Sequence, residues 1–434
     1  MSDIKKQQKK YFIEREAGGD KAVLVHVELP ASSADLTEFK ELVRSAGANV
    51  LALVTGRRDR PESKYFVGSG KADEIKHVVS ANAAEIVIFN HDLTPAQERN
   101  LEQLLQCRVI DRTGLILDIF AQRARTFEGK LQVELAQLKH LSTRLVRGWT
   151  HLERQRGGIG LRGPGETQLE TDRRLIGSRM KTINKRLQKV EVQRDQSRRS
   201  RIRAAIPTIS LVGYTNAGKS TLFNSLTEAH VYAAEQLFAT LDPTLRTLEI
   251  PLLGKVIISD TVGFVRDLPH DLVAAFKSTL EETRQAQLLL HVIDAHHAEK
   301  IDLINAVENV LTEIDAHELP ILEVYNKIDL CEETEPRIDR NEEGLPWRVW
   351  CSALTGVGLD LLKSAILERL GDTVVNCEII LTPQAGRVRA SLYQQGVVLS
   401  EETQESGDII LQVRMQRIEL EKLLMQEEVK LHVA

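Results

Sequence analysis

The sequence predicts an α/β multidomain protein, and three observations lead to this fold class. β-rich runs alternate with amphipathic helical stretches in two separate parts of the chain, and two long heptad-patterned stretches lie between those parts. A glycine-rich G-x-x-x-x-G-K-S motif directly follows a β-rich run of the second part. These patterns predict an N-terminal α/β parallel-sheet domain (1–126), an antiparallel helical hairpin (127–204), a P-loop domain with a six-stranded, mostly parallel sheet (205–371) and a small α+β C-terminal domain (372–434).

Composition and length limit the class further. A chain of 434 residues is too long for one ordinary hydrophobic core, and its 42% hydrophobic and 27% charged residues are typical of soluble globular proteins. No apolar run approaches the roughly 20 residues that cross a bilayer, and the start lacks the apolar centre of a secretory signal. We therefore expect a cytoplasmic protein without a membrane span. Four scattered cysteines without C-x-x-C spacing indicate neither a zinc site nor a disulfide framework.

The N-terminal part has four β-rich runs that are typical of buried strands: Lys21–Val27, Ala48–Val54, Glu85–Asn90 and Cys107–Asp111. Amphipathic helical stretches separate them, which predicts a parallel sheet covered by helices. The string Gly68-Ser69-Gly70-Lys71 resembles part of a P-loop but lacks the first glycine of the full motif. We expect an ordinary turn into a helix there, with a second phosphate site as the alternative.

The middle part shows two stretches with the 4-3 spacing of a heptad repeat, which places the apolar side chains of each on one helix face. The first stripe is Leu131, Leu135, Leu138 and Leu145, with Ser142 in one place, and the second is Ile176, Met180, Ile183, Leu187 and Val190. Two stripes joined by one loop predict an antiparallel hairpin. The loop, Arg154–Gln168, contains five glycines; it either enters a narrow RNA channel or acts as a flexible linker.

The second helix of this hairpin is strongly basic, and few carboxylates oppose its cations. Such a concentrated surplus suits the phosphate backbone of a nucleic acid, whereas a solvated helical face is the alternative. The cations are Arg173, Arg174, Arg179, Lys181, Lys185, Arg186, Lys189, Arg194, Arg198, Arg199, Arg201 and Arg203.

The P-loop motif runs from Gly213 to Ser220, directly after the β-rich run Thr208–Val212. Its glycines let backbone N–H groups surround phosphates at a helix N-terminus, where the helix dipole favours negative charge. We expect Lys219 to reach the β- and γ-phosphates and the Ser220 hydroxyl to ligate Mg²⁺.

Base specificity is indicated by Asn326-Lys327-Ile328-Asp329, which follows a β-rich run downstream. The Asp329 carboxylate can accept hydrogen bonds from N1–H and the exocyclic amine of guanine, an arrangement that adenine does not offer. Asn326 would contact the other edge of the base and tether the P-loop. Ser352-Ala353-Leu354 fits a loop whose backbone N–H recognises the guanine carbonyl, so the substrate we expect is GTP.

Two segments between these motifs are candidates for sensing the γ-phosphate. Asp260 would hold the Mg²⁺ shell and the Gly263 N–H would bond the γ-phosphate, while Thr240 is expected to close over Mg²⁺, with Thr244 as its competitor. The expected catalytic residues are Lys219, Thr240 and Gly263, and the expected metal ligands are Ser220 and Thr240. The full nucleotide-binding set is Gly213, Tyr214, Thr215, Asn216, Ala217, Gly218, Lys219, Ser220, Phe238, Ala239, Thr240, Leu241, Asp242, Asp260, Thr261, Val262, Gly263, Asn326, Lys327, Ile328, Asp329, Ser352, Ala353 and Leu354.

The residue after Gly263 bears on the rate of hydrolysis. Many GTPases have a glutamine there to orient the attacking water, but this chain has Phe264, which cannot hydrogen-bond water. Slow intrinsic hydrolysis is therefore expected, with help from another switch residue, a cation or a partner. Asn216 lies where some GTPases hold a potassium ligand, so stimulation by K⁺ is a hypothesis.

Taken together, these strings resemble the HflX family of translational GTPases over nearly the whole chain. The resemblance is carried by Lys64–Lys71, Arg108–Ala124, Gly157–Arg174, Gly213–Asn224, Phe238–Thr244 and Asp260–Pro269. It implies a GTPase that binds the large (50S) ribosomal subunit, reaches 23S rRNA with its N-terminal domain and hairpin, and separates stalled 70S ribosomes into subunits. It also implies that the ribosome stimulates hydrolysis and that an apolar residue at position 264 is normal.

Two other functions stay open at this stage. One is a GTP-gated RNA-binding factor in 50S assembly, and the other is an enzyme with additional ATP-dependent RNA-remodelling activity in its N-terminal region. Asp329 argues against ATP in the P-loop domain. We expect no DNA partner and a monomer.

Overall fold

The protein, seen in a computed structural model, divides into two compact units. The structure describes residues 20–432 except 31–34, 148–163, 204–205, 228–236, 239, 242–243, 252, 267–276, 372–373, 383–384, 396, 405–406, 417–419, 421–422 and 425–428. The first unit comprises 1–189, 234–242 and 265–277, and the second comprises 190–233, 243–264 and 278–434. The predicted domain boundaries after residues 126, 204 and 371 stay predictions.

The first unit contains the expected parallel sheet. Its strands lie in the order β2-β1-β3-β4 and all pair in parallel. Both ends of β1 are exposed while its six central residues are buried, because helices cover both faces of such a sheet. The strands are β1 (Lys21–Glu28), β2 (Asn49–Arg57), β3 (Ile86–Phe89) and β4 (Arg108–Ile110).

Four helices accompany this sheet, and side-chain caps fix where most of them begin. The carboxylates of Asp35 and Asp111 accept backbone N–H groups at the first turns of α2 and α5, and Thr94 forms a capping box with Gln97 at α4. Helix α3 starts after Gly68 without a side-chain cap. The helices are α2 (Leu36–Ala46), α3 (Ser69–Asn82), α4 (Pro95–Leu105) and α5 (Arg112–Arg123).

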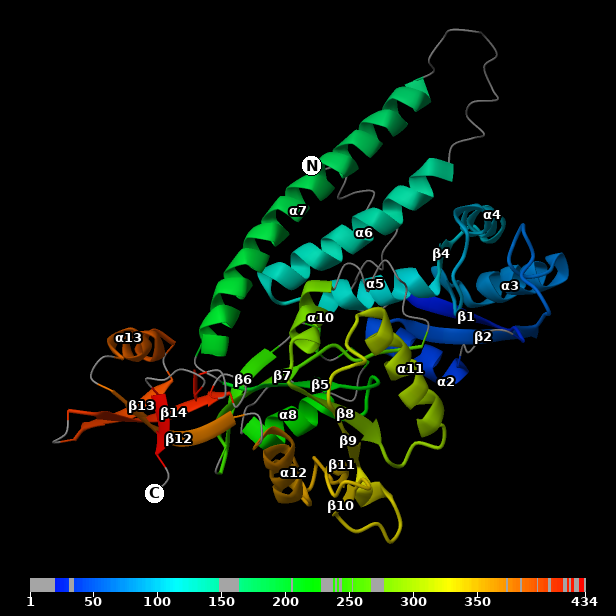
Figure 1. Ribbon diagram of the computed structural model, residues 1–434. Helices are drawn as coiled ribbons and strands as arrows, with labels where there is room; N and C mark the ends of the chain where they lie inside the picture. The colour runs from blue at the N-terminus through cyan, green and yellow to red at the C-terminus, as the bar shows by residue number, and fades with distance from the viewer. Residues whose placement is uncertain are drawn as a thin grey trace. The chain divides into compact units, whose positions relative to one another are not determined.

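The hairpin consists of α6 (Phe127–Arg147) and α7 (Pro164–Arg203), which Figure 1 draws side by side. Most of the predicted stripes pack together: one cluster joins Leu131, Leu135 and Leu138 of α6 to Ile176, Met180, Ile183 and Leu187. The cluster also contains Leu141, which was not predicted, and does not contain Val190, while the side chain of Leu145 lies outside the described residues. The predicted C-terminal end of the glycine loop, Gln168, is wrong, because Pro164–Gln168 belong to the first turns of α7. A proline is favourable in a first turn because its missing N–H is not needed there. The rest of the loop lies outside the described residues.

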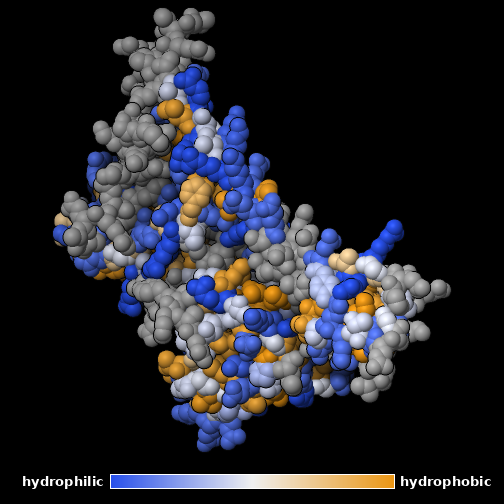
Figure 2. All heavy atoms as spheres, turned by 90° about the vertical axis from the view of Figure 1, so that its left-hand side faces the viewer, coloured by the Kyte–Doolittle hydropathy of each residue, from blue (hydrophilic) through white to orange (hydrophobic). Residues whose placement is uncertain are grey.

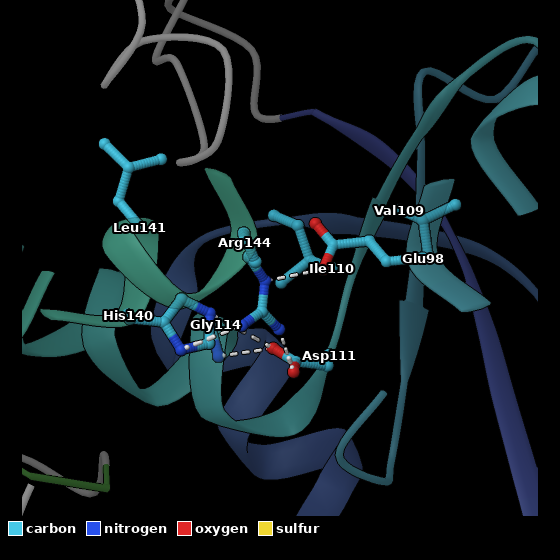
Figure 3. A pocket seen from close by; sticks show the side chains of 8 residues that line it. All are labelled: Glu98, Val109, Ile110, Asp111, Gly114, His140, Leu141 and Arg144. Carbon is cyan, nitrogen blue, oxygen red and sulfur yellow. Dashed lines mark hydrogen bonds and ion pairs between the residues drawn. The ribbon is translucent and has the colours of Figure 1, made fainter. Parts of the chain in front are cut away.

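A buried ion-pair cluster fastens α6 to helix α4 and to the start of α5, as Figure 3 shows. The Arg144 guanidinium lies 2.6 Å from a carboxylate oxygen of Glu98 and 2.5 Å from one of Asp111. Burial raises the pKa of Glu98 to about 7, although Arg144 opposes this shift. One cation thus faces two carboxylates around a cavity of about 10 Å³, which is roughly the size of one water.

The second unit is built on a mixed sheet in the order β10-β11-β9-β8-β5-β7-β6. The expected six strands are present, but the count was wrong because β10 (Arg337–Arg340) adds a seventh, antiparallel edge strand. Its sequence, Arg-Ile-Asp-Arg, is mostly charged and therefore lacks an apolar strand pattern. The others are β5 (Thr208–Val212), β6 (Thr244–Ile250), β7 (Gly254–Asp260), β8 (Leu288–Asp294), β9 (Ile321–Asn326) and β11 (Pro346–Trp350).

The remaining helices of this sheet and the C-terminal elements complete the second unit (Figure 1). Helices α8 (Lys219–Thr227), α10 (Lys277–Arg284), α11 (Lys300–Glu313) and α12 (Leu359–Gly371) accompany the mixed sheet. The predicted α+β appendage is confirmed as an antiparallel sheet, β13-β14-β12-β15, that is accompanied by helix α13. It comprises β12 (Val374–Leu381), α13 (Gly386–Gln395), β13 (Val398–Thr403), β14 (Ile409–Gln416) and β15 (Val429–His432).

The four cysteines are free thiols. Among the described residues, every helix is too short or too polar to traverse a lipid bilayer.

Arg414 of β14 holds the C-terminal sheet to the β6–β7 turn. Its guanidinium donates to the backbone oxygens of Leu253 and Lys255, and burial lowers its pKa. We expect Arg414→Ala to lower the free energy of unfolding by about 2 kcal/mol, because the half-buried carbonyl of Leu253 loses a charged donor and the exposed carbonyl of Lys255 loses a second bond.

A matched control is Arg389→Ala, which removes an exposed pair with Glu401 and should cost less than about 1 kcal/mol. Urea unfolding of both variants measures the difference. Equal losses of unfolding free energy in the two variants would show that the Arg414 contact stabilises the protein no more than an exposed ion pair does.

Candidate nucleotide-binding site

The P-loop lies between β5 and α8, at the carboxyl edge of the sheet, as predicted. The Lys219 side chain is buried, and its Nζ donates to the backbone oxygens of Gly213 at 2.9 Å and Tyr214 at 2.6 Å. Lys219 is also the first residue of α8, whose positive dipole end favours an anion. The loop therefore presents both a buried ammonium and a helix N-terminus at one place.

Two glycines of the loop cannot carry side chains. Gly213 has φ +147°, and a Cβ there would lie 2.3 Å from the backbone oxygen of Val292. Gly218 has φ +95°, and its Cβ would lie 2.2 Å from the Asn326 side-chain nitrogen. Glycine is required at both positions because neighbouring atoms already fill the space.

Asn326 ties three predicted motifs together from the end of β9. Its amide nitrogen donates to the Ala217 oxygen at 3.0 Å, and its amide oxygen accepts the Ala353 N–H at 2.9 Å. The side chain is buried, so both bonds are shielded from water. The P-loop, the Asn326–Asp329 segment and the Ser352–Leu354 segment are thereby brought into one site.

The expected base-recognition residues lie around this asparagine. The Ser352 hydroxyl donates to the Asp329 carboxylate, which orients it, whereas the sequence suggested only a backbone role for this segment. Lys327 adopts φ +66° and its Nζ lies 2.7 Å from the Asp294 carboxylate. Asp294 was not predicted; its position at the end of β8, beside Asn326 in the strand register, was the available signal.

Ser220 and Asp260 form the candidate metal pair. The Ser220 hydroxyl donates to the Asp260 carboxylate at 2.7 Å. A hydroxyl and a carboxylate are the hard oxygen donors that Mg²⁺ prefers, so this pair fits the ion that GTPases use. Thr261 is close by, but its hydroxyl donates to the Leu211 backbone oxygen and so acts within the sheet.

The predicted Phe238–Asp242 segment does not belong to the same unit as this pair. Phe238, Thr240 and Leu241 belong to the first unit, and Ala239 and Asp242 lie outside the described residues. The competitor Thr244 starts β6 and stands opposite Asp260 in the β6–β7 pairing. The choice of Thr240 as the metal-closing threonine therefore stays a prediction.

Gly263 and Phe264 lie directly on the P-loop. The Thr215 N–H donates to the Phe264 oxygen at 2.8 Å, and the Phe264 N–H donates to the Gly213 oxygen at 3.2 Å. The Phe264 ring is buried, so this position offers its backbone to the P-loop and an apolar side chain to the interior. It provides no polar group for a water molecule.

Burial sets the protonation of two groups beneath the loop. It lowers the pKa of Lys219 to about 8, with Asp260 opposing and Lys327 adding to the shift. Burial also lowers the pKa of His291 to about 4, and the charge of Lys219 contributes. His291 is therefore neutral at physiological pH, while Lys219 is mostly charged.

Four family models match successive parts of the chain. They are described as a GTP-binding GTPase N-terminal region (33–121), a GTP-binding GTPase middle region (123–201), a 50S ribosome-binding GTPase (208–327) and an HflX C-terminal domain (341–429).

Whole-chain relatives agree with these matches. The GTPase HflX of Escherichia coli (strain K12) is 61% identical over 418 residues, which cover 96% of this chain and 98% of the relative. The GTPase HflX of Caldanaerobacter subterraneus subsp. tengcongensis is 45% identical over 89% of both chains. A solved GTP-binding protein of Sulfolobus solfataricus in complex with GDP is 25% identical, with a TM-score of 0.44, over 81% of this chain and 99% of that one.

A glycine-restricted P-loop that Asn326 joins to the Asn326–Asp329 segment is typical of P-loop guanine-nucleotide-binding proteins. Identity of 61% over almost the full length then shows the family. The chain belongs to the HflX family of GTPases, and it hydrolyses GTP.

Asp329→Asn should exchange the base preference of the site. The asparagine amide donates an N–H at a point where the aspartate carboxylate accepts one. Xanthine has a carbonyl there, which can accept this N–H, whereas guanine has an exocyclic amine, which loses its acceptor. We expect guanine-nucleotide affinity to fall on the order of 100-fold while xanthine-nucleotide affinity rises. Competition binding measures both, with exposed Asp302→Asn as the control. An unchanged preference would remove Asp329 from base recognition.

Gly263→Ala should slow GTP turnover more than it weakens GDP binding. The added Cβ would lie 2.7 Å from the Thr215 methyl and 3.2 Å from Lys219 Nζ, so the segment facing the γ-phosphate must move. A displacement of this kind costs about 100-fold in single-turnover rate. Gly386→Ala, where the Cβ meets open space, is the control. Equal rates in both variants would contradict the assignment of Gly263.

Nucleotide binding near pH 8 should take up a proton at Lys219. Its lowered pKa means that part of the free protein has lost this charge at pH 8, and bound phosphate restores it. GDP titration calorimetry in buffers of different ionisation enthalpy should show uptake of roughly half a proton at pH 8. Lys219→Arg, which stays charged, should show none.

The lowered pKa of Lys219 also makes the stability of the free protein depend on pH. The unfolded chain binds the Lys219 proton more tightly, so the free energy of unfolding gains from this group as pH rises from about 8 toward 10.5. Absence of proton uptake at pH 8 would mean that Lys219 is not the phosphate-facing ammonium.

Proposed function

We propose that this GTPase binds the large (50S) ribosomal subunit, contacts 23S rRNA through its hairpin and dissociates stalled 70S ribosomes into subunits. We also propose that the ribosome stimulates its hydrolysis of GTP. The match to a 50S ribosome-binding GTPase model over 208–327 supports the partner. The single observation that carries the RNA contact is the exposed cationic surface of α7.

That surface is concentrated on the described part of the helix. Arg179 pairs with Glu134 at 2.6 Å and so acts within the hairpin, but its neighbours extend into solvent. Where α7 faces the viewer in Figure 2, the described surface is largely hydrophilic. The exposed cations are Arg173, Arg174, Lys181, Lys185, Arg186 and Lys189; the side chains of Arg198, Arg199, Arg201 and Arg203 lie outside the described residues.

Within the nucleotide site, each group has a proposed task. Lys219 neutralises charge on the β- and γ-phosphates, and the Gly263 N–H donates to the γ-phosphate. Ser220 and Asp260 hold Mg²⁺, with Thr240 as the closing ligand. When bound, Mg²⁺ neutralises the phosphate oxygens and so favours departure of the γ-phosphate. Asp329 recognises guanine.

Slow intrinsic turnover follows from Phe264, because a buried ring cannot orient the attacking water. The group that orients the attacking water is supplied by the ribosome, or a monovalent cation takes its place. Asn216, which is exposed and adopts φ +62°, is the proposed K⁺ ligand. Turnover that is equal in K⁺ and Na⁺ would exclude this role.

Neutralising the α7 surface should weaken ribosome binding without changing nucleotide affinity. The triple variant Lys185→Ala, Arg186→Ala and Lys189→Ala removes three exposed charges. We expect the slope of log affinity against log salt concentration to fall by about three, because each lost phosphate contact releases one counterion fewer. Sedimentation with purified 50S subunits measures it.

The matched control removes three exposed cations outside the hairpin, Arg246, Lys255 and Arg387. An equal effect of both triples would show that net charge, and not the α7 surface, drives binding.

The decisive experiment measures GTP turnover with and without 50S subunits and then adds GTP-bound protein to 70S particles. Stimulated turnover with more free 50S and 30S subunits in sucrose gradients is the expected result. Intact 70S particles together with binding only to 50S precursors would instead favour a factor of ribosome assembly.

A further inference from the structure

Asp294, the last residue of β8, holds the ammonium group of Lys327 in an ion pair. The Oδ2 atom of its carboxylate lies 2.7 Å from the Nζ atom of Lys327. Both side chains are largely buried, since 18% of Asp294 and 25% of Lys327 is exposed. Partial burial reduces screening by water, so this pair attracts more strongly than an ion pair on the open surface.

The Asp294 carboxylate is itself held in place by the backbone around it. Its Oδ1 atom accepts the N–H of His296 at 3.0 Å, so both carboxylate oxygens are engaged. The next residue, Ala295, donates its N–H to the Asn326 oxygen at 2.9 Å and accepts the Nζ of Lys300 at 3.1 Å. Strands β8 and β9 and helix α11 therefore fix the position of this acceptor.

The stem of Lys327 passes beside the P-loop. A Cβ atom added to Gly218 would lie 4.0 Å from the Cε atom of Lys327, which is an ordinary contact distance. Lys327 also adopts a left-handed backbone with φ +66°, a conformation that costs energy and persists only where the surroundings hold it. The hydrocarbon stem is thus directed across the space between the P-loop and Asp329.

Without Asp294, nothing described here would keep the end of this stem in place. The positive charge of Lys327 helps to lower the pKa of Lys219, so the two ammonium groups repel each other. A lysine stem is also flexible and has many rotamers, which an anchored ammonium group restricts. The carboxylate of Asp294 opposes the repulsion and fixes the end of the stem.

We propose that Asp294 is a positioning residue of the nucleotide site, which holds the Lys327 stem against one face of the guanine ring and so slows release of the nucleotide. The inference rests on the proposed function, in which Asp329 recognises guanine. Asp294 acts through Lys327, on the base, and leaves the contacts to the γ-phosphate unchanged.

The experiment uses the full chain loaded with GDP that carries a fluorescent group on its ribose, and follows release after a chase with unlabelled GDP. Asp294→Asn keeps an oxygen for the His296 N–H but removes the negative charge beside Lys327. We expect release to become about tenfold faster, because a charge-assisted hydrogen bond is lost. The single-turnover rate with saturating GTP should change by less than about twofold.

The matched control is Glu323→Gln, which removes the charge of another ion pair of the same sheet. Glu323 lies 2.9 Å from Arg348, and 23% of each side chain is exposed. GDP release from this variant should equal that from the unmodified protein. Equally fast release from both variants would overturn the inference, because loss of any such pair in the sheet would then loosen the site.

Two further readouts separate positioning from a general structural role. In a Lys327→Ala background, Asp294→Asn should add nothing to the release rate, since its effect passes through that lysine. Release of inosine diphosphate, which lacks the exocyclic amine, should accelerate by the same factor as release of GDP. Additive effects of the two substitutions, or a changed ratio of the two nucleotides, would contradict the proposed role.

Lys327→Ala by itself distinguishes failure of the inference from failure of the proposed base site. Release that is unchanged in this variant would mean that the Asn326–Asp329 segment does not hold the base as proposed, and the role of Asp294 would fail with it. Faster release in Lys327→Ala together with unchanged release in Asp294→Asn would leave the base site in place and overturn only the role of Asp294.

Discussion

The side-chain amide of Asn326 is the constraint on which the nucleotide site depends. Its two buried hydrogen bonds reach Ala217 in the P-loop and Ala353 in the Ser352–Leu354 segment. The same nitrogen fills the space beside Gly218, which explains why that position has no side chain. The P-loop and the Ser352–Leu354 segment are therefore parts of one rigid arrangement, since neither can shift without breaking a buried bond.

Buried charge gives this arrangement its preference for an anion. Lys219 is desolvated, and its backbone acceptors and Asp260 compensate for only part of that cost. His291 stays neutral below it because both burial and Lys219 disfavour its charged form. A phosphate supplies the negative charge that this environment favours, so the electrostatics of the site and its substrate agree.

The first unit uses charge for two different purposes. Near the loop end of α6, Arg144 is buried between Glu98 of α4 and Asp111 at the start of α5, where it fixes α6 against those helices. Along α7, other cations face solvent and can meet a polyanion. A hairpin whose first helix is held by buried ion pairs can carry an exposed basic surface on its second helix without losing its packing.

The sequence by itself determined the local features of this protein. The P-loop, the Asn326–Asp329 segment and the hairpin stripes are each encoded by neighbouring residues, because strand ends, helix starts and heptads are set over a few positions. It missed β10, whose charges conceal a strand that needs β11 as its partner. Only the tertiary structure decided the pairing of Asp294 with Lys327 and the Arg144 cluster. These join residues far apart in the chain, and folding alone brings them within contact distance.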